Sequence, residues 1–507
     1  MTRLVSSTSL TGFGLIFLAQ ASLADVTPQD VWGDWRDYMN GLGYEITGSE
    51  DTSGNTLTVS DVAVDIDLGT DEGTSKMQIG TLRFIDNGDG TVAIELPGSM
   101  PIEVTTKPAN GKSVNLKLDY TQTGFAMTAS GTPTDMIYDY SADTVGVVLN
   151  GLTVDGQPMA GDDAQADFTL SNITGRSEMK VASARSYDQS FEAENMTYSL
   201  MFKDPKGSGS ANFKGAAQGL GFTGQGAIPL QIMQANDVSK MLDAGFSVDG
   251  AFTYKGGNSE MAVVGPDGPV SGTTSTTGGM LGVKMSSDGI SYDVSQSGLA
   301  VNMISAALPL PIDFKVDEAK FNISAPIKKS DESSDFAFGI TLGGFTMSDV
   351  IWGVFDPQAK LPRDPATIAL ALSGKMRLLF DFLDPKAAAI SGNPNITPAE
   401  IDAVNLNNLQ VSAVGADLSG TGAFTFDNSA QLNGMPKPTG AVDLKLVGGN
   451  GLLDKLVAMG LLPQDQATQA RLMMGLLAVA GEGEDTLNSK IEINDQGHIL
   501  ANGQRIQ

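Results

Sequence analysis

Apolar and polar residues alternate over most of the chain. The alternation recurs in segments such as 57–66, 92–96 and 290–294, and a period of two is typical of strands that bury one face. Turn-forming steps such as Asn150 followed by Gly151 separate neighbouring segments. The pattern predicts a mainly β, β-rich α+β fold, in which a few short helices pack against or cap large curved antiparallel sheets.

The first patterned segment has helical spacing instead. Val31, Trp32, Trp35, Tyr38 and Met39 lie on one stripe of a helix. An aromatic stripe of this kind is more often a docked core face than a ligand-binding or membrane-binding surface. We therefore predict an N-terminal helix that packs on the sheet.

Later helices are predicted near residues 348–356, 451–459 and 463–480, where apolar residues recur every three or four positions. A brief helix is also predicted to begin at Pro398, followed by Ala and Glu. The Gly-, Ser- and Thr-rich run 271–279 is the segment whose composition best fits a loop or linker.

Residues 1–24 have the composition of a cleaved secretory signal peptide. Arg3 precedes a short apolar run at 10–19 and a small-x-small site at 22–24. The sequence thus predicts export to the periplasm of a Gram-negative envelope. No later segment is apolar over the roughly 20 residues that a transmembrane helix needs, so no transmembrane helix is expected after signal cleavage.

Two regions are expected after the signal. Residues 25–245 contain the N-terminal helix and a first antiparallel β region. Residues 246–507 contain a second antiparallel β region with the three later helices. Pattern alone leaves open whether the two regions form one continuous sheet.

Composition excludes several classes of function. The formal net charge of −28 argues against nucleic acid as a partner. The chain has no cysteine and one histidine, His498, so zinc fingers, Cys/His dyads and multi-histidine metal sites are excluded. We expect no catalytic residue, no metal and no cofactor.

One nucleotide-binding pattern occurs by chance. Residues 219–224 read Gly-Leu-Gly-Phe-Thr-Gly and match G-x-G-x-x-G. The dinucleotide-binding turn requires a helix that begins at the third glycine, whereas strand-like sequence continues on both sides here. We therefore interpret this segment as a strand.

The most distinctive local motif lies between two predicted strands and is interpreted as architectural. Its members are Trp352, Phe355, Asp356, Pro357, Pro362, Arg363, Asp364 and Pro365. The motif precedes the paired helices and a closing hairpin with Asp495, Gly497 and Ile499. In this order of features the chain resembles the alphaproteobacterial family of unknown function DUF2125, over most of its length. The ending is also similar to the AsmA-like and YdgA-like exported proteins.

The resemblance to DUF2125 implies no catalytic residue. The resemblance to the AsmA-like proteins implies, for this chain, a curved sheet whose apolar inner face binds lipid. We therefore expect a non-enzymatic exported protein that binds lipid or another apolar ligand, or acts as an envelope scaffold with other envelope proteins. Ile94 and Leu116 are candidate residues of the inner face. An outer-membrane-associated β protein and a carboxylate-based carbohydrate-active enzyme are the alternatives.

Overall fold

The computed structural model describes most of the chain. The described residues are 25–41, 43–67, 74–108, 111–205, 207, 209–230, 238–383, 397–432 and 435–507. The predicted signal peptide, residues 1–24, lies outside them.

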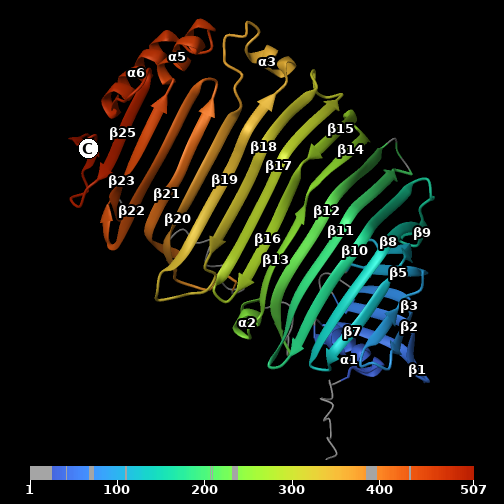
Figure 1. Cartoon of the computed structure of the whole chain (residues 1–507). Coiled ribbons are helices and arrows are strands. Elements are labelled where there is room, and N and C mark those ends of the chain that lie inside the picture. The colour runs from blue at the N-terminus through green and yellow to red at the C-terminus, as the bar shows by residue number, and fades with distance from the viewer. Residues whose placement is uncertain are drawn as a thin grey trace, which may run out of the picture.

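In the part of the chain that the structure describes, twenty-seven strands form one antiparallel sheet, which Figure 1 shows as a long curved band. The first strands are β1 (Tyr44–Ser53), β2 (Thr56–Asp67), β3 (Thr74–Asp86), β4 (Val92–Glu95), β5 (Ser99–Lys107), β6 (Val114–Thr123), β7 (Ala126–Thr132), β8 (Asp135–Val154) and β9 (Gln157–Pro158). The middle strands are β10 (Ala164–Val181), β11 (Ala184–Lys203), β12 (Ser210–Pro229), β13 (Ser247–Tyr254), β14 (Gly256–Gly265), β15 (Gly268–Thr276), β16 (Gly278–Ser286), β17 (Gly289–Ser305), β18 (Ile312–Ala325), β19 (Ser334–Met347) and β20 (Ala366–Leu378). The last are β21 (Ala399–Ala413), β22 (Ala416–Leu432), β23 (Met435–Val447), β24 (Val479–Ala480), β25 (Thr486–Ile493), β26 (Ile499–Ala501) and β27 (Gln504–Arg505). The mainly β prediction is confirmed.

Several long strands pair with two shorter strands that lie end to end. Residues 221–227 of β12 pair with β13, and residues 210–218 pair with β14. Lys255, between the two short strands, donates its amide to the carbonyl of Gln218 at 2.8 Å. These hydrogen bonds join the sheet across residue 245, where the sequence suggested a division into two regions.

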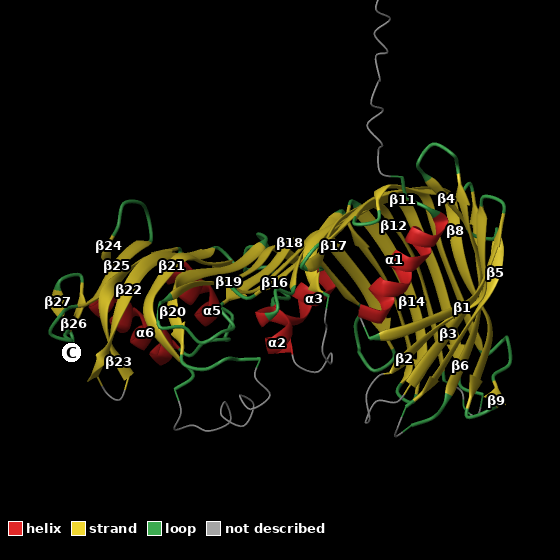
Figure 2. Ribbon diagram, turned by 90° about the horizontal axis from the view of Figure 1, so that it is seen from below, coloured by secondary structure: helices red, strands yellow, loops and turns green. Residues whose placement is uncertain are grey.

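The N-terminal strands curl around helix α1 (Pro28–Gly41), as Figure 2 shows. Val31 and Trp32 of α1 are at most 2 % exposed and pack with Val59, Phe84 and neighbouring residues of the strands. The ring of Trp35 meets Phe84 edge-on, with 5.4 Å between ring centres. The predicted docked aromatic face of the helix is therefore confirmed.

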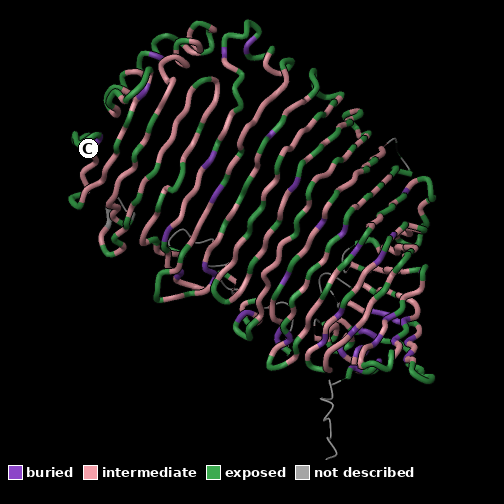
Figure 3. Tube along the Cα trace, viewed as in Figure 1, coloured by how far each residue is buried: buried purple, intermediate pink, exposed green. Residues whose placement is uncertain are grey.

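Side-chain burial is uneven along the sheet. The two clusters of buried apolar residues lie between α1 and β12. From β13 onward most residues are half-buried or exposed, as Figure 3 shows. The reason is geometric: a single sheet without a second layer leaves both faces open to solvent.

The remaining described helices lie at the ends of strands. They are α2 (Val238–Asp243), α3 (Asp349–Phe355), α5 (Gly449–Ala458) and α6 (Gln464–Leu477), and the last three match the predicted helices closely. Within the described residues, no helix has the length and hydrophobicity needed to cross a membrane.

Three local predictions are wrong. The segment expected to start a helix at Pro398 is strand β21, where Glu400 pairs with Arg377 of β20. The expected loop 271–279 lies mainly in β15 and β16, and Asn150 with Gly151 lies inside β8. At residues 271–279 and 399–400, pairing with neighbouring strands outweighs a local preference of about 1 kcal/mol or less. Asn150 lies at a register shift between β6 and β8, so the strand takes it up as a β-bulge instead of turning there.

Candidate functional site

A continuous row of apolar side chains crosses the sheet at right angles to the strands. Directly paired residues of an antiparallel sheet point to the same side, so the register alone defines such rows. We call this row the apolar stripe. Its members, in spatial order, are Met127, Tyr140, Gly175, Phe191, Phe222, Phe252, Leu281, Val294, Phe321, Ile340, Leu370, Leu409, Gly420 and Leu444.

The central part of the stripe is open to solvent. Leu281 is 46 % exposed and Ile340 is 44 % exposed. A second apolar row lies two residues away on the same face, from Val283 to Val442, and the ring of Phe338 in that row meets Phe321 at 5.9 Å. The stripe is therefore part of a wider apolar band in this half of the sheet.

The two glycines of the stripe do not interrupt its apolar surface. A Cβ atom at Gly175 would lie 2.2 Å from Cζ of Tyr140, and one at Gly420 would lie 2.6 Å from a methyl carbon of Leu444. The neighbouring side chains thus already occupy the space above each glycine.

The opposite face of the sheet is polar or small along the same line. Its row is Thr128, Asp139, Arg176, Ser190, Thr223, Ala251, Gly282, Asp293, Asn322, Gly339, Ala371 and Asn408. Arg176 in this row forms an ion pair with Asp139 at 2.9 Å. The sheet therefore has one apolar and one polar face, and α1 covers the apolar face at the N-terminal end of the row.

The stripe begins at a cavity beneath α1. The cavity has a volume of about 240 Å³ and is lined by Trp35, Tyr38 and Met39 of the helix. Met127 and Tyr140, the first two members of the stripe, line it from the sheet side. The cavity and the stripe therefore share residues and form one apolar surface.

A buried ion pair fixes α1 against the sheet at this cavity. The carboxylate of Asp34 binds the guanidinium of Arg185 on β11, and the two side chains are 5 % and 7 % exposed. The hydroxyl of Tyr138 donates to Oδ2 of Asp34 at 2.9 Å. Burial and the nearby Asp34 carboxylate raise the pKa of Tyr138, so the phenol keeps its proton and remains a donor.

Larger hollows on the surface have a different character. One of about 510 Å³ is lined by charged and polar residues that include Lys180, Asp188 and Lys284. A further hollow of about 560 Å³ includes Glu45, Asp65 and Lys76 in its lining. The cavity under α1 is smaller than these two hollows and differs from them in its lining, which consists mainly of aromatic and methionine side chains.

The two residues predicted for the inner face lie on the side of the sheet that α1 covers. Ile94 pairs with Phe84, and the register of β4 with β7 places it in line with Met127. It is 2 % exposed, because the core beneath α1 covers it. Leu116 is half-buried on β6, opposite Val104. Ile94 is thus shielded from solvent, whereas Leu116 is partly exposed.

The predicted motif around residue 352 surrounds the short helix α3. Arg363 forms an ion pair with Asp349 and lies 5.8 Å from the ring centre of Trp352. Asp356 ends the helix and accepts hydrogen bonds from the amides of Lys360 (2.9 Å) and Leu361 (2.8 Å).

Other members of the motif are accessible: Phe355, which is 57 % exposed, Asp364 and Pro365. Pro357 is exposed and Pro362 is half-buried in the turn that follows the helix. The observed contacts of the motif hold the crossing between β19 and β20 in place.

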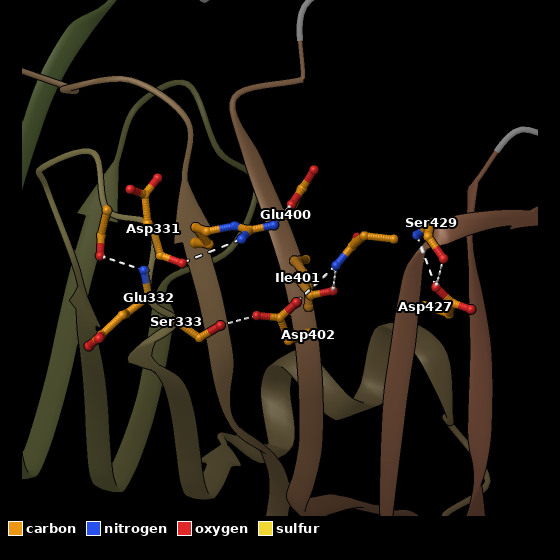
Figure 4. A network of polar contacts seen from close by, with 11 residues as sticks. Asp331, Glu332, Ser333, Glu400, Ile401, Asp402, Asp427 and Ser429 are labelled. Atoms are coloured by element: carbon orange, nitrogen blue, oxygen red, sulfur yellow. Dashed lines mark hydrogen bonds and ion pairs between the residues drawn. The ribbon is translucent and has the colours of Figure 1, made fainter.

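A group of carboxylates near the start of β21 is engaged in hydrogen bonds between strands (Figure 4). Arg377 binds Glu400 and donates to the carbonyl of Asp331 at 3.4 Å. The side-chain amide of Asn428 donates to Asp402 at 2.9 Å. These contacts tie the ends of β20, β21 and β22 together. Among the described residues, no three acidic or histidine side chains gather in a way that could hold a metal ion.

The segment 219–224 lies inside β12 and is not followed by a helix, so its glycine pattern does not form a nucleotide-binding turn. His498 is half-buried beside the turn that follows β25, where its amide donates to Oδ1 of Asn494 at 3.0 Å.

Sequence reasoning missed both the stripe and the buried ion pair. The alternation identified most of the stripe residues as apolar strand positions, but only the register places them in one row. Asp34 and Arg185 are 151 positions apart, and neither residue stands out from its neighbours in sequence. Aromatic residues that recur in alternating segments were the only signal of the stripe.

Comparison with known families matches about half of the chain to a family of uncharacterized proteins. Residues 252–500 match the model of the family described as "Uncharacterized protein conserved in bacteria (DUF2125)". This stretch carries the stripe from Phe252 to Leu444 and the motif around residue 352, whereas α1 and the cavity precede it. No curated protein and no solved structure matches the chain. The similarity to AsmA-like proteins is not shown by these comparisons and stays a prediction.

Proposed function

We propose that this chain, which belongs through residues 252–500 to the DUF2125 family of uncharacterized bacterial proteins, is an exported protein. In this proposal it binds the hydrocarbon chains of lipids along its apolar stripe. The observation that carries this proposal is the unbroken apolar row across the sheet, exposed in its centre and opposite a polar face. Soluble proteins rarely expose a continuous apolar surface of this extent unless something binds there.

The length of the stripe favours an extended ligand. Its members span thirteen steps between strands, and steps of about 4.8 Å give a path of roughly 60 Å. The hydrocarbon core of a bilayer is about 30 Å thick, so one acyl layer measures about 15 Å. The stripe therefore has room for several chains in succession or for movement of one chain along it.

The charge of the protein fits uncharged ligand groups better than anionic ones. With a net charge of −28, the surface repels nucleic acid and anionic headgroups at long range. Contact with hydrocarbon through the stripe does not depend on this charge, because the driving force is burial of apolar surface.

A pair of adjacent substitutions tests the proposal. Ile340→Asp places a carboxylate in the middle of the stripe, whereas Thr341→Asp places the same charge on the polar face, opposite Lys320. Purified protein of each variant would be analysed by native mass spectrometry and lipid extraction. We expect lipid to co-purify with the wild type and with Thr341→Asp, and to be reduced at least about tenfold in Ile340→Asp, since a charge in contact with hydrocarbon costs more than 1.4 kcal/mol.

Lipid retained equally by both variants would contradict binding along the stripe. Protein that is free of lipid in all three forms would instead favour the role of an envelope scaffold, and protein partners would then be sought.

A further inference from the structure

The cavity under α1 closes one end of the apolar stripe. Met127 and Tyr140 belong to both, so an extended chain on the stripe reaches the cavity without crossing a polar surface. Beyond these two residues the row continues to Ile94, which is 2 % exposed in the core that packs against α1, so the accessible path ends here. The stripe thus has an end at which a chain must stop.

The lining of the cavity is suited to the methyl end of a chain. Three methionines (Met39, Met127 and Met179) line it together with aromatic rings, and methionine side chains adapt their shape to apolar guests. An apolar cavity of about 150 Å³ already holds a molecule the size of benzene, and this one has about 240 Å³. Several methylene groups therefore fit inside.

The carboxylate at the cavity is already paired. The carboxylate of Asp34 is bound by Arg185 and by the hydroxyl of Tyr138. A polar group at the far end of a ligand chain would therefore enter the cavity without a free ionic partner, and burying such a group is unfavourable. A methyl group meets no such penalty.

We propose that the cavity between α1 and strands β7, β8 and β10 is a terminal site that takes the methyl end of one unbranched hydrocarbon chain, so that the polar end of the ligand points along the stripe toward the C-terminal strands. This inference rests on the proposed function, because the rest of the chain lies on the stripe. It assigns the ligand class as a chain with one polar end.

Decanol and the decanediol that carries a hydroxyl at each end distinguish this site from the open stripe. A chain that lies only on the stripe keeps both ends in water, and the two compounds then bind equally. A chain whose end enters the cavity must bury one hydroxyl of the diol. By isothermal titration calorimetry on the full chain, we expect the wild type to bind decanol at least about tenfold more tightly than the diol.

A cavity-filling variant and a matched control complete the experiment. Ser177→Phe adds a ring to the cavity lining, whereas Ser190→Phe adds the same ring to the exposed opposite face of the neighbouring strand. Ser177→Phe should bind decanol more weakly, by about fourfold for each methylene displaced, and should lose most of its preference over the diol. Ser190→Phe should behave as the wild type does.

The outcomes separate this inference from the proposed function. Equal binding of decanol and diol by the wild type, with loss of both in Ile340→Asp, overturns the terminal site and leaves the stripe in place. The absence of binding of either compound to the wild type overturns both proposals. The wild-type comparison stands even if Ser177→Phe fails to fold.

Discussion

Glycine lies directly opposite an aromatic residue at several places in the sheet, and at each the ring covers the glycine. These pairs are Tyr140 with Gly175, Tyr187 with Gly226, Tyr198 with Gly215, Tyr254 with Gly279, and Phe336 with Gly374. At each glycine an added Cβ would lie less than 3 Å from the ring of its partner. The 60 glycines of the chain therefore include positions where the missing side chain makes room for a neighbour.

This geometry predicts that Gly175→Ala destabilises the protein. The new methyl group would displace the ring of Tyr140, which lines the cavity, and overpacking of this kind costs about 1–3 kcal/mol. Gly265→Ala is the control, because its added Cβ meets no atom within 4 Å. The measurement is the midpoint of thermal unfolding. A midpoint that falls equally in both variants would contradict the role assigned to the ring.

At the scale of single elements, helix α5 is capped by a residue from a distant segment. The carboxylate of Asp485 accepts hydrogen bonds from the amide of Gly451 at 2.8 Å and from the side-chain amide of Asn450 at 2.9 Å. The helix itself begins after Gly448, whose lack of a side chain leaves the first amides without a local cap. Tertiary contact thus replaces the missing local signal.

The pH dependence of this cap follows from the pKa of Asp485. Burial alone would raise the pKa, but the hydrogen bonds from Gly451 and Asn450 outweigh it and hold the pKa below its ordinary value. A carboxyl group with a lowered pKa in the folded state stabilises the fold above its unfolded pKa of about 3.9 and loses this contribution as the pH falls further. We expect the hydrogen-exchange protection factors of the Asn450 and Gly451 amides to be constant down to about pH 4 and to decrease below it.

Asp485→Asn supplies the comparison for that measurement. Its protection factors at neutral pH should be lower than those of the wild type, and they should not change between pH 5 and about pH 3 in the way the wild type does. A wild-type profile that matches that of the variant would show that the carboxylate does not cap the helix.

At the scale of the whole molecule, stability is distributed unevenly. The clusters of buried side chains lie between α1 and β12, whereas the part of the sheet that carries the exposed stripe has few fully buried residues (Figure 3). Local opening is easiest where few apolar contacts hold the backbone. The surface proposed to bind lipid therefore lies in the less protected half of the molecule.

Hydrogen exchange followed by mass spectrometry tests this gradient. We expect slow exchange in β2, β3 and β8 and exchange that is faster by at least about tenfold in β15 to β19, since a difference of about 1.4 kcal/mol in opening free energy changes the rate tenfold. Removal of bound lipid should accelerate exchange further in β15 to β19 and leave β2 and β3 unchanged. Uniform protection along the sheet would contradict this distribution.

The sequence by itself determined the class of fold and the positions of most elements, because both follow from local periodicity. Alternation identified the strands, and helical spacing located α1, α3, α5 and α6. The sequence also excluded Cys/His dyads and multi-histidine metal sites, because that conclusion depends on composition alone. Where a local signal was weak, as at Pro398, pairing with β20 overruled it.

Only the tertiary structure decided which apolar residues form one surface. A shift of one residue in the register of any strand would move its side chains to the other face, so the stripe exists only through the observed pairing. The same is true of the cavity and of the Asp34–Arg185 ion pair, which join α1 to strands far along the chain. Periodicity is a property of neighbours in sequence, whereas the candidate site is made by neighbours in space.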